Sequence, residues 1–422
     1  MVHETKLELL LPLVLKDETK MEEEELLLGQ KVWIQTEVGV QGPKDQRSGQ
    51  SMDEGGETTK EQQEGRECQG EESDEDWDTD LELGDQEEAD ALMEKMNYRK
   101  TCERLHVAPA SRFLENMQKS DLSMKHYGLG PQGTKALAVS LVTNTSIRRV
   151  NLRDNWMEGM GGAAIAKMLQ KNCYITEVDL SDNNLRDFGA RAISNMLKVN
   201  NTLVSLHLSG NHFTDQSAEN LVPALISNTT LQHLDLSCNA LGDHAGQTLG
   251  NYLSENMGLR SLCLAWNCFR GRGAVTLANG LGGNVYLRSV DLSNNDFGKE
   301  GAVALGQALK DNDVLEELNV SNNRIPPEGA IHLAMGLKEN KTIRFLNVGR
   351  NPIQNIGCSK ILQSLQENPD SSIETLDFSD ITVNEDFEDL YTAVKKTFSA
   401  LRVKHGGTIG PLRKAKSWKV LE

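Results

Sequence analysis

The chain of 422 residues contains no apolar run that approaches the roughly 18 residues needed for a membrane-spanning helix. The nearest candidate, residues 7–15, is short, contains a glutamate and has no basic leader. We therefore expect neither a signal peptide nor a membrane anchor. The seven cysteines stand at scattered spacings without a Cys-x-x-Cys pair, which is typical of a reduced, intracellular chain. We expect a cytoplasmic protein.

The motifs of common catalytic sites are missing as well. The sequence has no Gly-x-x-x-x-Gly-Lys-Ser/Thr loop, no Gly-x-Ser-x-Gly and no His-Glu-x-x-His. The histidines and cysteines between positions 207 and 268 do not follow a zinc-ligand spacing. We expect no enzymatic activity, no metal and no cofactor.

The negative charge of the chain is confined to one end. Residues 1–100 hold 29 acidic and 11 basic side chains, and the remaining residues hold 33 of each. Because acidic chains repel phosphate backbones, we expect no nucleic-acid partner. Residues 1–95 are poor in apolar side chains over much of their length, which predicts a mostly disordered acidic arm. Within this arm, Ser73 begins the run Ser-Asp-Glu-Asp and is a candidate phosphosite.

A repeat of 28 residues runs through most of the remaining chain. The unit L-x-x-L-x-L-x-x-N-x-L matches eight times without slippage. Its asparagines are Asn155, Asn183, Asn211, Asn239, Asn267, Asn295, Asn323 and Asn351. In the second half of each unit, aliphatic residues four positions apart indicate one helix face. A second asparagine follows each helix, at Asn172 and every 28 residues up to Asn340 and Asn368.

This pattern predicts a strand, a turn, a helix and a return loop in each unit, with leucines that only stacked neighbours can bury. We expect an α/β solenoid of about ten units over residues 122–400, with parallel strands on the concave face and helices on the convex face. The first asparagine should satisfy backbone groups of adjacent turns, and the second should end its helix in the left-handed conformation. We expect a helical lead-in at 96–121, a last strand near 373–378 and a basic tail at 401–422.

The 28-residue unit resembles the ribonuclease-inhibitor-like class of leucine-rich repeats. The lead-in with Tyr98, Cys102, Pro109 and Phe113 resembles that of small intracellular leucine-rich-repeat proteins of the 74 type. The fold implied by this resemblance is a horseshoe, but a fold alone does not define a function.

Positions that the repeat leaves free are the candidate binding residues. Trp156 and Trp266 occupy exposed positions where the fold needs no tryptophan, and exposed aromatic anchors are common binding hot spots. The other candidates on the concave face are Arg153, Asp179, His207, Asp235, Asp291 and Arg350. The three aspartates lie at one equivalent position in alternate strands and would form an acidic stripe. Packing of the indoles against neighbouring side chains, and aspartate as ordinary filler of the repeat, are the alternatives.

We therefore expect a monomeric scaffold that binds a protein partner on its concave face. A small-GTPase regulator is the alternative, because ribonuclease-inhibitor-like repeats and an acidic segment also occur in the activating protein of the nuclear transport GTPase. In that protein the acidic segment follows the repeats, whereas here it precedes them.

Overall fold

The computed structural model describes residues 80–409, and the chain from Ala91 onwards forms one compact unit. Three sequence predictions lie outside the described residues. They are the phosphosite Ser73, the acidic stretch before residue 80 and the basic residues after residue 409.

Eleven strands form one continuous parallel sheet with the order β1 to β10 followed by β12. In sequence order they are β1 Asp121–Ser123, β2 Arg149–Asn151, β3 Glu177–Asp179, β4 Ser205–His207, β5 His233–Asp235, β6 Ser261–Cys263, β7 Ser289–Asp291, β8 Glu317–Asn319, β9 Phe345–Asn347, β10 Thr375–Phe378 and β12 Arg402–His405. Two short strands, β11 Val383–Asn384 and β13 Thr408–Ile409, pair beside the last repeats.

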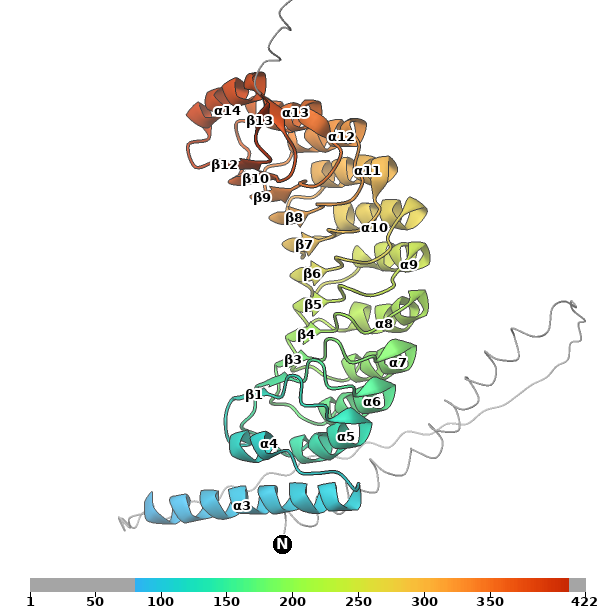
Figure 1. The fold of residues 1–422 in the computed structure, drawn as a ribbon, viewed down its shortest axis with the longest axis vertical. Helices are drawn as coiled ribbons and strands as arrows, with labels where there is room; N and C mark the ends of the chain where they lie inside the picture. Colours follow the sequence, from blue (N-terminus) through green and yellow to red (C-terminus); the bar gives the residue numbers. More distant parts are fainter. Residues whose placement is uncertain (1–79, 410–422) are drawn as a thin grey trace, which may run out of the picture. The chain divides into compact units, whose positions relative to one another are not determined.

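Helices cover the opposite side of this sheet, so that strands line the inner edge of the stack and helices its outer edge (Figure 1). The repeat helices are α5 Gly130–Leu141, α6 Glu158–Leu169, α7 Arg186–Leu197, α8 Asp215–Ser227, α9 Asp243–Leu253, α10 Gly271–Gly283, α11 Gly298–Asp311, α12 Pro327–Leu337 and α13 Gln354–Glu367. This arrangement confirms the predicted solenoid with parallel strands on the concave face.

The predicted ladder residues form the core between the two layers. In a typical repeat, Leu203, Leu206 and Leu208 of the strand side and Leu221 of the helix are each at most 2% exposed. The same burial recurs from repeat to repeat, giving one continuous core. Because each repeat buries its leucines only against its neighbours, the interfaces between repeats stabilise the array.

The first set of asparagines forms a hydrogen-bonded ladder on the inner side of the turns. The side-chain amide of Asn211, which is fully buried, donates to the carbonyl oxygens of Leu180 (2.9 Å) and Leu208 (3.1 Å). Its Oδ1 accepts from the backbone N–H of Asn183 at 3.0 Å. Each such asparagine therefore satisfies backbone groups of its own turn and of the preceding repeat, as predicted.

The second set of asparagines forms another ladder, and here the predicted left-handed conformation is wrong. Asn228 and Asn312, which cap α8 and α11, have φ values of −88° and −92°. The side-chain amide of Asn228 instead donates to the carbonyl oxygens of Leu197 (2.8 Å) and Asn200 (2.9 Å) in the preceding repeat. These residues stop the helices through buried bonds between repeats, so they need no positive φ.

Aspartates at the start of two helices cap the helix of the next repeat. Oδ1 of Asp215 in α8 accepts from the backbone N–H of Gly242 (2.6 Å) and Ala245 (3.1 Å) at the start of α9. Oδ1 of Asp243 in α9 likewise accepts from Gly273 N–H in α10 at 2.7 Å. A carboxylate there satisfies free N–H groups and interacts favourably with the helix dipole. The repeats are thus joined on their helical side as well.

Glycines let some of the helices approach closely. A Cβ on Gly250 in α9 would collide with the Thr276 carbonyl of α10, and one on Gly336 in α12 would collide with the Gly306 carbonyl of α11. In contrast, α8 and α9 meet through larger apolar side chains, including Ile226 and Tyr252, and leave a small hollow of about 20 Å³. The separation of neighbouring helices therefore varies along the array.

Both ends of the array differ from the prediction. Helix α3, Asp80–Arg104, begins inside the segment predicted to be disordered and before the predicted boundary at residue 95. Its first half is rich in Glu and Leu, which are strong helix formers and outweigh the low apolar content. Helix α4, Ser111–Asn116, completes the lead-in, and Phe113 packs edge-on against Tyr98 at a centroid distance of 4.7 Å.

At the other end, the segment predicted as a tail from residue 401 contributes β12, which pairs in parallel with β10. The predicted last strand near 373–378 is therefore the last but one. Val403 continues the inward-facing position of the ladder, opposite Leu376. Helix α14, Glu385–Thr397, lies between these strands in sequence and buries Phe387 and Val394. It covers the end of the core.

The asparagine ladder predicts a large effect for one substitution. Asn211→Ala removes the donors to two carbonyl oxygens and the acceptor for an N–H, all buried, so the free energy of unfolding should fall by about 3 kcal/mol. Chemical denaturation followed by circular dichroism measures this change. Asn251→Ala is the control, since Asn251 is exposed on α9 and its loss should cost under about 0.5 kcal/mol. Equal losses for both variants would contradict the structural role of the ladder.

Candidate functional site

Two rows of side chains project from the concave face of the sheet, one from the first and one from the third residue of each strand. Neighbours within a row are direct register partners across the sheet. The first row from β1 to β12 is Asp121, Arg149, Glu177, Ser205, His233, Ser261, Ser289, Glu317, Phe345, Thr375 and Arg402. The third row is Ser123, Asn151, Asp179, His207, Asp235, Cys263, Asp291, Asn319, Asn347, Asp377 and Lys404.

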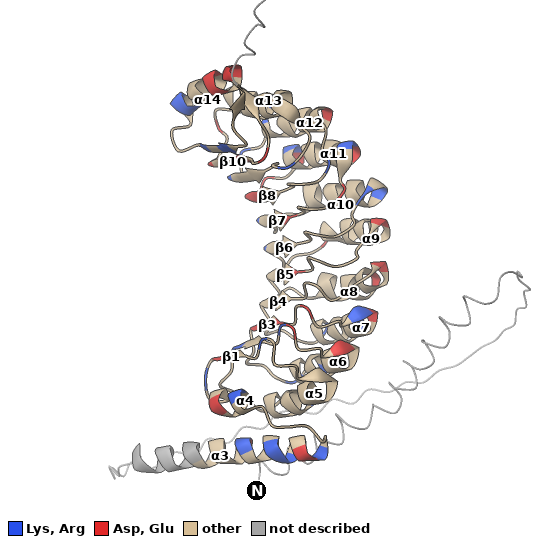
Figure 2. Ribbon diagram, in the orientation of Figure 1, with Lys and Arg blue, Asp and Glu red and all other residues tan. Residues whose placement is uncertain are grey.

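The register confirms that Asp179, Asp235 and Asp291 share one row, with His207 and Cys263 between them. Two glutamates of the first row add to this negative charge: Glu177 and Glu317. Strands β3 to β8 carry no lysine or arginine (Figure 2). The centre of the concave face is therefore acidic, whereas Arg149 flanks it on one side and Arg402 and Lys404 on the other.

Each aspartate of the third row also has a structural task. Oδ1 of Asp179 accepts from the Ser181 N–H at 3.0 Å, and Oδ1 of Asp291 accepts from the Ser293 N–H at 2.8 Å. Asn319 makes the same bond to Ser321 at 3.1 Å. The prediction treated these aspartates as binding residues or filler, but they close the turn after the strand. Because asparagine closes the turn equally well, the charge itself is not required by the fold.

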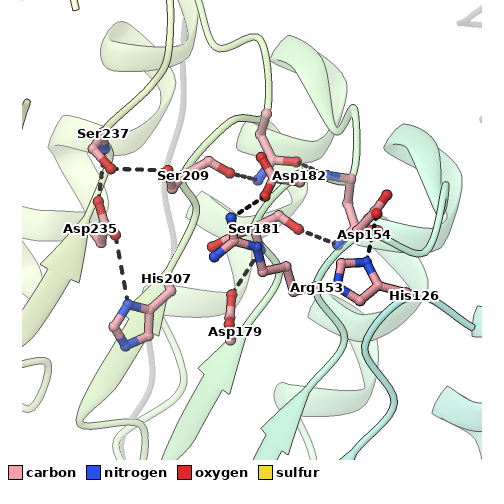
Figure 3. Close-up of polar contacts among 12 residues, drawn as sticks. His126, Arg153, Asp154, Asp179, Ser181, Asp182, His207, Ser209, Asp235 and Ser237 are labelled. Carbon is pink, nitrogen blue, oxygen red and sulfur yellow. Dashed lines mark hydrogen bonds and ion pairs between the residues drawn. The ribbon is translucent and has the colours of Figure 1, made fainter. Parts of the chain in front are cut away.

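His207 is the member of the third row that lies between two aspartates. Its Nδ1 faces Oδ2 of Asp235 at 3.8 Å, and its Nε2 lies 3.1 Å from Oγ of Ser205 (Figure 3). The Asp235 carboxylate raises the pKa of the imidazole; burial of the ring opposes this, and the charges of Asp179 and Glu177 reinforce it.

Burial alone would raise the pKa of Asp235. Hydrogen bonds from His207 and Ser237 outweigh this effect and hold the pKa below its ordinary value. The two side chains therefore form a partly buried ion pair on the concave face.

Ser205, His207 and Asp235 have the order of a catalytic triad, but the surroundings differ from a hydrolase site. A triad acts together with backbone N–H groups that point at the developing oxyanion. Here the N–H groups of Val204 and Ser205 both donate to the Thr176 carbonyl oxygen, at 2.8 and 3.0 Å. Those two donors are part of the sheet and are not available to a substrate.

Cys263 lies in the third row between two aspartates, Asp235 and Asp291. Burial raises the pKa of Cys263 to about 12, and the charges of Asp235 and Asp291 reinforce this. Among residues 80–409, no group of three histidine, cysteine or acidic side chains is placed to hold a metal ion.

The rim of the concave face, where the strands lead into the turns, is tied by ion pairs between repeats. Nη2 of Arg153 lies 2.8 Å from Oδ2 of Asp182 (Figure 3), and Nε of Arg350 lies 2.9 Å from Oδ2 of Asp380. The sequence prediction named both arginines as binding residues but missed their acidic partners. Those partners follow 29 and 30 residues later, about one repeat, so the repeat spacing itself contained the signal.

The two tryptophans lie on the rim at different repeat positions. Trp156 follows the ladder asparagine Asn155, whereas Trp266 precedes Asn267. The two residues are 72% and 61% exposed, so most of each tryptophan is open to solvent. Both have positive φ, 56° and 54°. They lie four repeats apart, roughly 19 Å along the sheet, and thus form two separate anchors.

Positive φ at these positions belongs to the fold, since the residue before the ladder asparagine is left-handed in most repeats. Asp182, Gly210, Asn294 and Asn322 occupy it elsewhere. These residue types tolerate the left-handed conformation, whereas tryptophan there costs roughly 1 kcal/mol or more. Trp266 therefore lowers the stability of the fold relative to aspartate, asparagine or glycine at the same position.

The comparisons with known proteins agree with this geometry. The model of the family described as "Leucine Rich repeat" matches seven segments: 143–166, 171–194, 199–222, 227–250, 283–306, 311–334 and 339–362. Each segment runs from the end of one repeat helix through the next strand and turn into the following helix. These units are leucine-rich repeats.

Two curated relatives carry the same kind of repeat. Leucine-rich repeat-containing protein 74B of Homo sapiens is 43% identical over 73 residues, which is 17% of this chain and 19% of the relative. The Mus musculus protein of that name is 44% identical over 52 residues, or 12% of this chain and 13% of the relative. The matches thus span a fifth or less of the relatives' length. Over that part, they agree with the resemblance to the 74 type.

Among solved structures, "Leiomodin-1 Actin-Binding Site 2 (ABS2)" aligns with 36% of this chain and 91% of its own, at 25% identity and a TM-score of 0.30. In the part of the leucine-rich-repeat chain that is described, no helix is both long and apolar enough to span a bilayer.

The His207–Asp235 pair predicts that the stability difference between the wild type and Asp235→Asn depends on pH. Since the pKa of His207 is raised, the attraction stabilises the fold while the imidazole is charged and is lost as the pH rises through that pKa. In Asp235→Asn the His207 pKa should fall, which a pH titration of the imidazole NMR signals measures.

The stability difference between the wild type and Asp235→Asn should accordingly be larger at pH 6 than at pH 9. An unchanged His207 midpoint in the variant would contradict the ion pair.

Proposed function

We propose that this chain is a non-enzymatic scaffold that binds a protein partner on the concave face of its leucine-rich repeats. The observation that carries the proposal is that each repeat uses one set of residues for its core and leaves another set exposed on the concave face. Leucines and asparagines of the repeat are buried in the fold, while the first and third rows and the rim project from a sheet face that none of the described elements covers. Solenoids generally use such extended concave surfaces for binding.

The two exposed tryptophans support this proposal. Trp156 and Trp266 offer large apolar surfaces at 72% and 61% exposure, and buried tryptophans are among the commonest hot spots of interfaces. Between them lies the acidic centre with Asp179, His207 and Asp235. The partner we propose contacts both indoles and sets its register through this polar centre. Asp291 continues the centre beyond Trp266, and Arg153 and Arg350 define the rim at the two ends.

Replacement of both tryptophans tests the concave site. Trp156→Asn and Trp266→Asn are preferable to alanine, because Asn184 and Asn294 occupy the equivalent positions in other repeats and tolerate positive φ. We expect the double variant to bind a partner captured by proximity labelling about 2 kcal/mol more weakly, roughly thirtyfold in Kd. Calorimetry or surface plasmon resonance with the purified partner measures this change.

Met335→Ala and Tyr252→Ala are matched controls, since both side chains are exposed on the helical side, at 60% and 42%. They should leave the Kd unchanged. A double tryptophan variant that binds normally would remove the concave site from consideration. Acceleration of GTP hydrolysis by the full chain, measured with a panel of small GTPases, would overturn the scaffold in favour of the alternative regulator.

A further inference from the structure

Three carboxylates of the concave face lie toward its C-terminal half: Asp235 on β5, Asp291 on β7 and Glu317 on β8. We call them the C-terminal acidic face. The donors to the last two are neutral, namely the Asn319 amide to Asp291 at 3.0 Å and the Ser289 hydroxyl to Glu317 at 2.8 Å. Strands β3 to β8 contain no lysine or arginine, and His207, which pairs with Asp235, leaves Asp291 and Glu317 without a cationic partner on these strands.

The described chain ends beyond β12, at the end of the sheet that is nearer to this face. The described residues end with β13, where Ile409 is 57% exposed, just after β12 at the edge of the sheet. Thirteen residues follow, Gly-Pro-Leu-Arg-Lys-Ala-Lys-Ser-Trp-Lys-Val-Leu-Glu, with four basic side chains and one acidic side chain. The segment is thus opposite in charge to the C-terminal acidic face.

The length of this segment is sufficient for it to reach the face. Thirteen residues span at most roughly 43 Å when extended. From β12, strand β8 is three strand steps away, β7 four and β5 six, which corresponds to roughly 14, 19 and 29 Å. The carboxylates of β3 are eight steps away, roughly 38 Å, which only a fully extended segment could bridge.

The described end of the chain already shows the same charge pairing. Nζ of Lys404 on β12 lies 3.3 Å from Oδ2 of Asp377 on β10, its register partner in the third row. Nε2 of His405 lies 3.3 Å from Oε1 of Glu388, which also accepts from the Thr408 hydroxyl at 2.7 Å. Basic and polar groups of the last residues therefore pair with carboxylates of the preceding repeats.

We propose that residues 411–419 bind across the C-terminal acidic face, with Arg413, Lys414, Lys416 and Lys419 opposite Glu317, Asp291 and Asp235. The short tether gives the segment a high effective concentration at this face, so weak individual pairs suffice. The segment occupies part of the surface on which the proposed partner docks. That competition rests on the proposed function, whereas the docking itself does not.

Zero-length carbodiimide coupling of the full chain tests the docking, because it joins a lysine amine to a carboxylate in contact with it. We expect amide links from Lys414, Lys416 or Lys419 to the C-terminal acidic face, mapped by mass spectrometry in the monomeric product. Their yield should fall several-fold in 0.5 M salt, at which the Debye length is only roughly 4 Å.

Two double variants provide a matched comparison on the same sheet face. Asp291→Asn with Glu317→Gln should remove most of the links. Glu177→Gln with Asp179→Asn, which changes the same two rows at the far limit of the segment's reach, should leave most of them. Asparagine retains the turn bond at both aspartate positions, as it does at Asn319, so both variants should fold. Equal yields in the two variants would overturn the docking.

If the basic segment binds elsewhere, carbodiimide coupling gives different cross-linked products. Links that join it mainly to residues 1–90, or links found only in a dimeric product, would also overturn the proposal. A separate readout concerns the partner: neutralising all four basic residues with glutamine should tighten its binding about threefold or more. If the links form but partner affinity is unchanged, the docking holds and the partner binds elsewhere. If the links are absent while the tryptophan variants lose the partner, only the docking fails.

Discussion

The burial of backbone polar groups between repeats is the constraint on which this structure depends. Every turn brings carbonyl and N–H groups into a continuous apolar core, where an unpaired group is costly. Two asparagine ladders solve this problem at the two ends of each strand, as Asn211 and Asn228 show. Both ladders join neighbouring repeats and therefore favour the constant 28-residue spacing. With the spacing fixed, the side chains that face the concave surface are fixed as well.

The structural features that recur in every repeat could be predicted from the sequence. The eightfold asparagine register and the leucine pattern led directly to the parallel sheet and its helical cover. The features that occur only once were harder to predict. The helical start at Asp80 and the last strand at Arg402–His405 have no counterpart elsewhere in the chain from which to recognise them. The conformation of the second asparagines was predicted wrongly because helix-end statistics were applied to residues whose side chains bond to the preceding repeat.

The sequence was sufficient to predict which side chains of the candidate site are exposed, but not which hydrogen bonds and ion pairs they make. The sequence placed the tryptophans, the third-row aspartates and the rim arginines on one side of the array. It did not show that Asp179 closes a turn, or that Arg153 and Arg350 bind aspartates of the following repeat. Such pairs join residues 29 or 30 positions apart, and they become visible only when sequences of successive repeats are aligned in register.

On the concave face, the two carboxylate oxygens of each third-row aspartate have different roles. One oxygen of each third-row aspartate closes the turn, and the other faces a neighbour on the next strand. Since Asn151, Asn319 and Asn347 close equivalent turns, the choice between aspartate and asparagine alters charge with little effect on stability. Surface potential can therefore change from strand to strand without altering the architecture.

The glycine contacts between helices have a geometric consequence for this face. A solenoid bends because neighbouring helices on its outer side lie farther apart than neighbouring strands on its inner side. At Gly250 and Gly336 the helices approach more closely, because no side chain separates their backbones. A side chain at either glycine would push the two helices apart and so increase the bend at that junction.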